Sequence, residues 1–175
     1  VVSCKQLFCI NRNRNGNLDS KVFSNLPKKI EKGSKCFLLA SIAGAKQCDE
    51  NRELTKKTNV DLVKRVCDLG FEKIVFTSTT SVYGNSKNFS SENSSVQPTS
   101  YYTETKLMAE EFLTNKYASN SWILRFAPVY SSSFLLNIKR RTKIGSWFYR
   151  IGNGEAKLSL CNIKNIQSVI EGIIY

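Results

Sequence analysis

The apolar residues of this chain fall into short continuous runs that alternate with amphipathic segments. The runs cover residues 5–11, 36–40, 73–76 and 122–126. Runs of this length with few polar interruptions are typical of strands that are buried on both faces. A further short strand is expected at 158–163, after a turn at 150–155.

Two segments, residues 49–69 and 100–118, have the residue spacing of amphipathic helices, and a closing helix is expected at about 165–174. Gly70 ends the first of them. In the first two helices, the residues expected to face the core are Leu54, Leu62, Val63, Val66, Leu69, Leu107, Met108, Phe112 and Leu113.

Alternating strands and helices predict an α/β fold with a doubly wound, mostly parallel sheet of the Rossmann-like type. Ligands of such sheets bind beyond the carboxyl ends of the strands. The segments expected to carry the chemistry are therefore residues 40–44, residues 77–84 and the turn after Phe126.

The composition excludes several classes of site. The chain contains no histidine, so Ser-His-Asp and Cys-His nucleophiles, imidazole catalysis and histidine-ligated metals are impossible within it. Its six cysteines form no C-x-x-C pair, and we predict no metal site. Most of them lie in apolar segments, which indicates reduced thiols and a cytoplasmic protein.

The formal net charge of +12 does not by itself identify a class of partner. Such an excess is compatible with nucleic-acid binding, but the basic residues are scattered and cluster only in pairs, so we predict no nucleic-acid partner. No apolar run approaches the roughly 18 residues of a membrane span, and we predict no membrane association.

Tyr102 and Lys106 lie four residues apart on a predicted helix and therefore share one face. A lysine ammonium near a phenol favours the phenolate and lowers its pKa from about 10 toward neutrality. The tyrosine can then act as a general base in a chain without histidine. The same spacing also occurs on ordinary solvated helices, so the pair alone does not establish catalysis.

A run rich in hydroxyl groups leaves the strand at 73–76 and includes Thr77, Ser78, Thr79, Thr80 and Ser81. Hydroxyls at the end of a strand can bind a substrate oxygen while the tyrosine takes its proton. The alternative is that they satisfy backbone groups in a turn.

Together these segments resemble the extended short-chain dehydrogenase/reductase family. The resemblance rests on F-T-S-T-T-S-V-Y-G at 76–84, on 98–106 with Ala109-Glu110, and on I-L-R at 123–125 with P-V-Y at 128–130. It is closest to the NAD-dependent nucleotide-sugar epimerases and dehydratases of the UDP-galactose 4-epimerase type. T-N-V at 58–60 is similar to a segment of that family, as is 36–41, where Leu38 replaces a histidine.

The resemblance implies that Thr79 binds a sugar hydroxyl, that Tyr102 removes its proton, and that Lys106 holds the nicotinamide ribose. Hydride would pass to NAD, and an epimerase would return it to the other face of the 4-keto sugar. The residues implied to line the cofactor are Asn11, Arg12, Leu39, Ala40, Ser41, Asn59, Thr77, Tyr102, Lys106, Pro128 and Val129.

Departures from the family pattern narrow the reaction. The family's dehydratases carry an acidic pair directly after the hydroxyl residue, where this chain has Thr80 and Ser81, so water elimination is disfavoured. A 4-epimerase is then the leading hypothesis, with an NAD(P)H-dependent keto-sugar reductase as the alternative. The residues predicted to contact a nucleotide-diphosphate sugar are Thr79, Thr80, Ser81, Tyr102, Arg140 and Arg141, although a solvated basic face explains the two arginines equally well.

The family's glycine-rich turn, which binds the cofactor pyrophosphate, is not in this sequence. Asn11 stands where an acidic ribose partner is expected, and the adjacent Arg12 is a hint of NADP. We therefore expect a partial dinucleotide-binding domain at 1–130, without its first strand–helix unit, and a reduced substrate-lobe segment with a closing helix at 131–175. Such a chain is a piece of a longer enzyme or a truncated gene product, and a non-catalytic remnant is the remaining alternative.

The family resemblance also implies a homodimer. Members of the family commonly pair through the helix that carries the reactive tyrosine and the helix before it. In this chain these are the predicted helices at 100–118 and 49–69.

Overall fold

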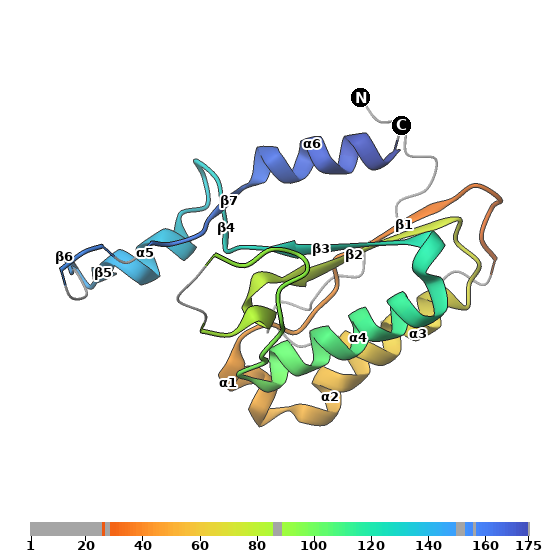
Figure 1. The fold of residues 1–175 in the computed structure, drawn as a ribbon, viewed down its shortest axis with the longest axis horizontal. Helices are drawn as coiled ribbons and strands as arrows, with labels where there is room; N and C mark the ends of the chain where they lie inside the picture. The colour runs from red at the N-terminus through yellow and green to blue at the C-terminus, as the bar shows by residue number, and fades with distance from the viewer. Residues whose placement is uncertain (1–25, 27–28, 86–88, 150–152, 156, 175) are drawn as a thin grey trace.

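The centre of the molecule is a parallel sheet of three strands in the order β1-β2-β3 (Figure 1). The computed structural model describes residues 26, 29–85, 89–149, 153–155 and 157–174. The strands are β1 (Lys35–Leu38), β2 (Lys73–Thr79) and β3 (Ser121–Phe126), and both pairings are parallel. The strand predicted at 5–11 lies outside the described residues.

Helices connect these strands, as the parallel pairing requires. The first connection is a helical arm made of α1 (Ala45–Glu50), α2 (Arg52–Lys56), the π-helical turn η2 (Lys57–Asp61) and α3 (Leu62–Cys67). The second consists of the 3-10 turn η3 (Thr80–Tyr83), α4 (Tyr101–Tyr117) and the 3-10 turn η4 (Ala118–Asn120). The helix predicted at 49–69 is therefore broken near its start, because Asn51 takes a non-helical backbone conformation.

The helices form layers on the two sides of the sheet. Figure 1 shows α3 and α4 along one face and α6 (Ile163–Ile174) on the other. The Lys35 ammonium donates a hydrogen bond to the carbonyl of Ile173 (3.2 Å), so the end of α6 lies beside the start of β1. This arrangement confirms the predicted Rossmann-like α/β fold.

The C-terminal part holds only short strands. β4 (Val129–Tyr130) pairs in parallel with β7 (Cys161–Asn162), and α5 (Leu136–Thr142) leads into a hairpin of β5 (Lys143–Ile144) and β6 (Trp147–Phe148). The strand predicted at 158–163 is thus reduced to residues 161–162, and α6 begins directly after it at Ile163.

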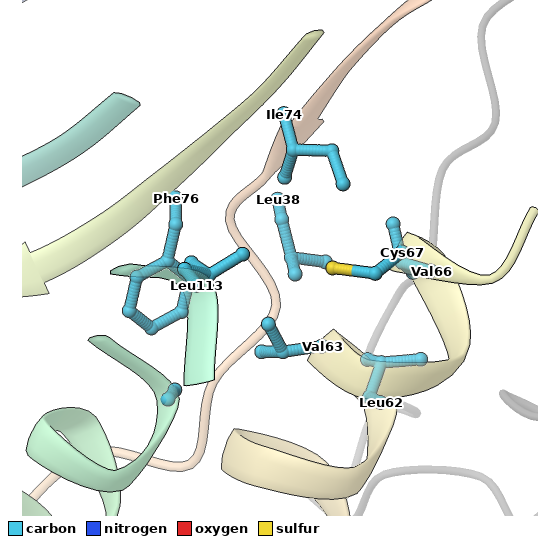
Figure 2. Packing of buried hydrophobic residues seen from close by; sticks show 9 residues of the cluster. Leu38, Leu62, Val63, Val66, Cys67, Ile74, Phe76 and Leu113 are labelled. Carbon is cyan, nitrogen blue, oxygen red and sulfur yellow. The ribbon is translucent and has the colours of Figure 1, made fainter. Parts of the chain in front are cut away.

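The core lies between the sheet and the helices α3 and α4. Figure 2 shows Leu38, Ile74 and Phe76 of the strands meeting Val63 of α3 and Leu113 of α4. All of these side chains are buried.

Two residues predicted to face the core do not. Leu54 and Met108 are exposed to 37% and 44%. The face that α4 turns toward the sheet carries Thr103, Lys106 and Glu110 among its buried residues instead, and this polar face forms the site described next. Among the described helices, none combines the length and the apolar character that a bilayer crossing requires.

Candidate active site

Helix α4 places two of the predicted residues in its first two turns. The helix begins after Ser100, whose side chain accepts a hydrogen bond from the Thr103 backbone N–H (3.3 Å). The Thr103 hydroxyl accepts in return from the Ser100 N–H (3.1 Å), which completes a capping box. This cap fixes where the helix starts, and with it the positions of Tyr102 and Lys106.

Lys106 is a buried cation directed at the end of β2. The residue is only 2% exposed, and its ammonium donates a hydrogen bond to the Thr77 carbonyl (2.8 Å). The ammonium lies 4.7 Å from the centre of the Phe76 ring and 6.0 Å from that of Tyr102. Burial lowers the pKa of Lys106 to about 8, against the opposing influence of Glu110 and Cys48.

Tyr102 lies close to Thr79. The Thr79 side chain hydrogen-bonds with the Tyr102 hydroxyl, which by itself lowers the pKa of the tyrosine. Burial outweighs this contact and raises that pKa above its ordinary value, and nearby Cys48 adds to the rise. The lowered pKa expected from the Tyr102–Lys106 spacing is therefore not found in the structure, because burial of the phenol is the largest influence on its pKa.

Asn59 holds the loop that follows β1. Its amide donates to the Ile42 carbonyl (3.0 Å) and to the Thr105 hydroxyl (3.1 Å), and its oxygen accepts from the Ile42 N–H (2.8 Å) and the Ser41 hydroxyl (3.2 Å). The residue is 1% exposed. Asn59 thus shapes the predicted cofactor segment from behind, and its own amide is turned into the protein.

The other predicted cofactor residues of the described chain gather at the carboxyl ends of the three strands. The Thr77 hydroxyl donates to the Leu38 carbonyl (3.2 Å) and so ties the end of β2 to that of β1. Next to this contact, Leu39 is 62% exposed and Ala40 packs partly against the core. Pro128 and Val129 follow β3, and Val129 is half-buried in β4. Asn11 and Arg12 lie outside the described residues.

The predicted substrate residues are only partly brought together. Thr80 and Ser81 follow Thr79 directly, and the Ser81 N–H donates to the Thr79 hydroxyl (3.1 Å). Arg140 and Arg141 are exposed on α5, where both guanidinium groups bond to Asn137 of the same helix. These contacts favour the solvated basic face over a diphosphate contact for the two arginines.

One buried network has no counterpart in the predicted site. The Arg125 guanidinium of β3 forms a salt bridge with Glu110 of α4 (Nη2 to Oε2, 2.6 Å), and the Ser78 hydroxyl donates to the same carboxylate. Arg125 also donates to the Tyr83 hydroxyl (2.9 Å). Glu110 and Arg125 are part of the motifs that carry the family resemblance, and the position of Glu110 four residues after Lys106 was the available signal.

Solved structures share this fold. The chain matches MoeE5 in complex with UDP-glucose and NAD at 25% identity and a TM-score of 0.61, over 76% of this chain and 49% of that one. It matches UDP-glucuronic acid 4-epimerase from Bacillus cereus, in complex with UDP-glucuronic acid and NAD, at 21% identity and a TM-score of 0.62, over 77% and 48%. A hypothetical dTDP-4-dehydrorhamnose reductase from Sulfolobus tokodaii gives 20% identity and 0.63, over 79% and 50%. The chain therefore spans about half the length of these structures.

The sequence matches a family of enzymes but no curated protein. Residues 11–168 match the model of the NAD dependent epimerase/dehydratase family, which is most of the chain and includes Thr79, Tyr102 and Lys106. The chain belongs to the NAD dependent epimerase/dehydratase family.

Proposed function

We propose that this chain carries the proton-transfer centre of a nucleotide-sugar 4-epimerase that works by transient oxidation of the sugar with NAD. The observation that carries the proposal is the contact of Tyr102 with Thr79 beside the buried ammonium of Lys106. Family membership supports it, and so do the NAD and UDP-sugar complexes of the similar structures.

The residues at the strand ends suit a dinucleotide. Lys106 is in none of the salt bridges formed by the described residues. Its ammonium has three N–H donors and uses one of them on the Thr77 carbonyl, which leaves two for ribose hydroxyls. The segment from Leu39 to Ser41 and the half-buried Val129 would hold the cofactor on either side. NAD, when bound there, supplies the acceptor for the hydride of the sugar carbon.

The chain's own part in the reaction is the transfer of a proton. Tyr102 is placed to take the proton of the sugar hydroxyl as the carbonyl forms, and to return it when the carbonyl is reduced. Thr79 offers the same sugar oxygen a hydrogen bond, since its hydroxyl lies against that of Tyr102. Lys106 supplies positive charge near the phenol, although burial lowers the pKa of its own ammonium.

An epimerase fits this site better than a dehydratase. Thr80 and Ser81 follow Thr79 and offer hydroxyl groups, which are poor general acids and bases at neutral pH. Loss of water from the sugar needs a group that delivers a proton to the leaving hydroxyl. The site as described has no carboxylate at these two positions.

A fluorescence titration with NADH and NADPH tests the proposed cofactor site directly. We expect saturable binding to the wild-type chain and a loss of at least tenfold in affinity in Lys106→Met, because the ribose loses a charged donor. Lys116→Met is the matched control, since Lys116 is exposed on the same helix. No binding by the wild type, or equal loss in both variants, would contradict the proposal, and the preferred nucleotide would settle the NADP hint from Arg12.

We also propose a homodimer formed by the outer faces of α2, α3 and α4. Leu54 of α2 and Met108 of α4 are large apolar side chains exposed on these helices. Burial of such groups is a usual contribution to dimer interfaces. The partner surface would be the same face of a second copy.

A cytoplasmic location is the last part of the proposal. The four cysteines of the described chain, Cys36, Cys48, Cys67 and Cys161, are free thiols. Burial raises the pKa of Cys36 to about 11 and that of Cys67 to about 12, which keeps both thiols protonated and unreactive. Such cysteines are typical of a reducing compartment.

A further inference from the structure

Glu110 is a buried carboxylate in the second half of the helix that carries Tyr102 and Lys106. It is 4% exposed and lies one turn beyond Lys106 on the same face of α4. The cost of burying a carboxylate requires strong partners. The single Nε–H of Arg125 is shared between both Glu110 oxygens (3.1 Å each), and Nη2 donates to Oε2 (2.6 Å). The Ser78 hydroxyl donates a further hydrogen bond to this carboxylate.

These contacts add to others that join the end of β2 to α4. The Thr77 carbonyl accepts from Lys106, the Ser78 hydroxyl donates to Glu110, and the Thr79 hydroxyl bonds with Tyr102. Three consecutive residues of the strand thus meet three residues spaced by one helical turn each. A shift of α4 along or around its axis would break all three contacts together.

We propose that Glu110, held between Arg125 and Ser78, is a positioning residue that fixes α4 against β2 in the one register that places Tyr102 on Thr79 and Lys106 on the Thr77 carbonyl. Arg125 lies opposite Ser78 in the parallel pairing of β2 and β3, so a guanidinium from β3 and a hydroxyl from β2 both bind the Glu110 carboxylate of the helix. This positioning role matters for catalysis only if the proposed function is correct, but the contacts that define it are between protein residues and involve no cofactor.

Arg125 extends the same restraint to the turn after β2. Its Nη1 donates to the Tyr83 hydroxyl (2.9 Å) and to the Glu92 carbonyl (3.4 Å), and the guanidinium lies 5.0 Å from the centre of the Tyr83 ring. Tyr83 ends the turn η3, which begins directly after Thr79. The network therefore holds the Thr79 side of the site as well as the Tyr102 side.

The network also has an electrostatic consequence at Lys106. The titratable groups that act on its ammonium are Glu110 on the same helix and Cys48 on α1, and both oppose the effect of burial. Tyr102 faces it from one turn earlier, while β2 contributes the Thr77 carbonyl and the Phe76 ring. Removal of the Glu110 charge should therefore lower the pKa of Lys106 further.

An NMR titration of the 175-residue chain with isotope-labelled lysine tests this inference without any assay of activity. Lys106→Met identifies the Lys106 signal. We expect Glu110→Gln to move the midpoint of this signal below the wild-type value of about 8, and the exposed Glu111→Gln to leave it unchanged. An unchanged midpoint in a folded Glu110→Gln chain would overturn the inference.

A second measurement covers a Glu110→Gln chain that fails to fold. Arg125→Lys keeps the positive charge but loses the planar guanidinium fork that joins β3 to Glu110 of α4 and to Tyr83. We expect the signals of Thr77, Ser78 and Thr79 to shift in Arg125→Lys and not in Lys116→Met, and unmoved signals would overturn the inference. If the wild-type chain binds no NADH while these shifts appear, the proposed function fails and the positioning network stands.

Discussion

At the scale of single residues, the candidate site contains ionisable groups whose charged forms are destabilised by burial. Lys106 and Tyr102 are both largely withdrawn from water, and burial is the main cause of the change in each pKa. Their charged forms are therefore more reactive and more costly than in water. Sites of catalysis often carry this kind of cost in stability.

Lys106→Met should stabilise the fold at neutral pH. Burial lowers the pKa of Lys106 from 10.5 to about 8, so below about pH 8 the folded chain must hold a buried charge that the unfolded chain leaves in water. We expect the free energy of unfolding to rise by about 1–3 kcal/mol at pH 7, less what the lost hydrogen bond to Thr77 contributes.

The pH dependence gives the sign of this effect. Between pH 8 and 10.5 the unfolded wild type binds more protons than the folded one, so its stability rises with pH and the advantage of Lys106→Met shrinks. Urea unfolding at several pH values measures both curves. A variant that is less stable than wild type at pH 7, with no change of the difference up to pH 10, would contradict the account.

At the scale of elements, local features set the start of α4 and the end of β2. The capping box at Ser100 fixes the helix, and the turn η3 fixes the strand. Gly84 ends that turn with a φ of 69°, a conformation that side chains rarely adopt. A Cβ at Gly84 would lie 2.6 Å from the Gln97 carbonyl oxygen.

Gly84→Ala should therefore destabilise the chain, by about 1–3 kcal/mol for the strained backbone and the clash with Gln97. Gly172→Ala is the matched control, because Gly172 lies in α6 with open space around its Cα, and alanine favours a helix by up to about 1 kcal/mol. Thermal unfolding of both variants measures the contrast. Similar melting temperatures for the two variants would show that the η3 turn does not constrain the fold.

The sequence predicted the elements better than their contacts. The strand at 73–76 and the helix at 100–118 follow from local periodicity, and both are present as β2 and α4. The sheet-facing side of α4 was predicted to be apolar, and Met108 was wrongly placed there. Its true face carries Lys106 and Glu110, whose partners come from strands that are distant in sequence.

The same limit applies to the site. Thr79, Tyr102 and Lys106 could be predicted from motifs, and the structure brings them together. Arg125 acquires its role only through the register of β3 against β2, which periodicity does not specify. The lowered pKa of Tyr102 was a prediction from spacing alone, and burial reverses it.

At the scale of the whole molecule, the chain combines a well-packed sheet with a sparse C-terminal part. Ile144, Trp147 and Phe148 of the β5–β6 hairpin are exposed to 69%, 79% and 75%. The chain spans about half the length of the similar solved structures. The proposed site of proton transfer nevertheless lies within the part that is best packed, between β2 and α4.

Light scattering tests the proposed homodimer. We expect a mass near twice the 19.8 kDa of the chain, and a shift toward the monomer in Met108→Glu, which places a charge in the expected interface. Phe89→Glu is a control, because Phe89 is 86% exposed and lies outside α2, α3 and α4. A wild-type monomer at every concentration would contradict the proposed dimer.

The most direct test of the central claim compares sugar epimerisation by the wild type, Tyr102→Phe and Tyr101→Phe in the presence of NAD. Tyr101 is the neighbouring tyrosine and packs against Arg52 through its ring, so the loss of its hydroxyl should have little effect. We predict that the wild type interconverts the two epimers of a UDP-sugar without net consumption of NAD, and that Tyr102→Phe lowers turnover by about 10²–10⁴-fold with the fold intact. Equal turnover in Tyr102→Phe and Tyr101→Phe, or no oxidation of the sugar by a wild-type chain that binds NAD, would contradict this prediction.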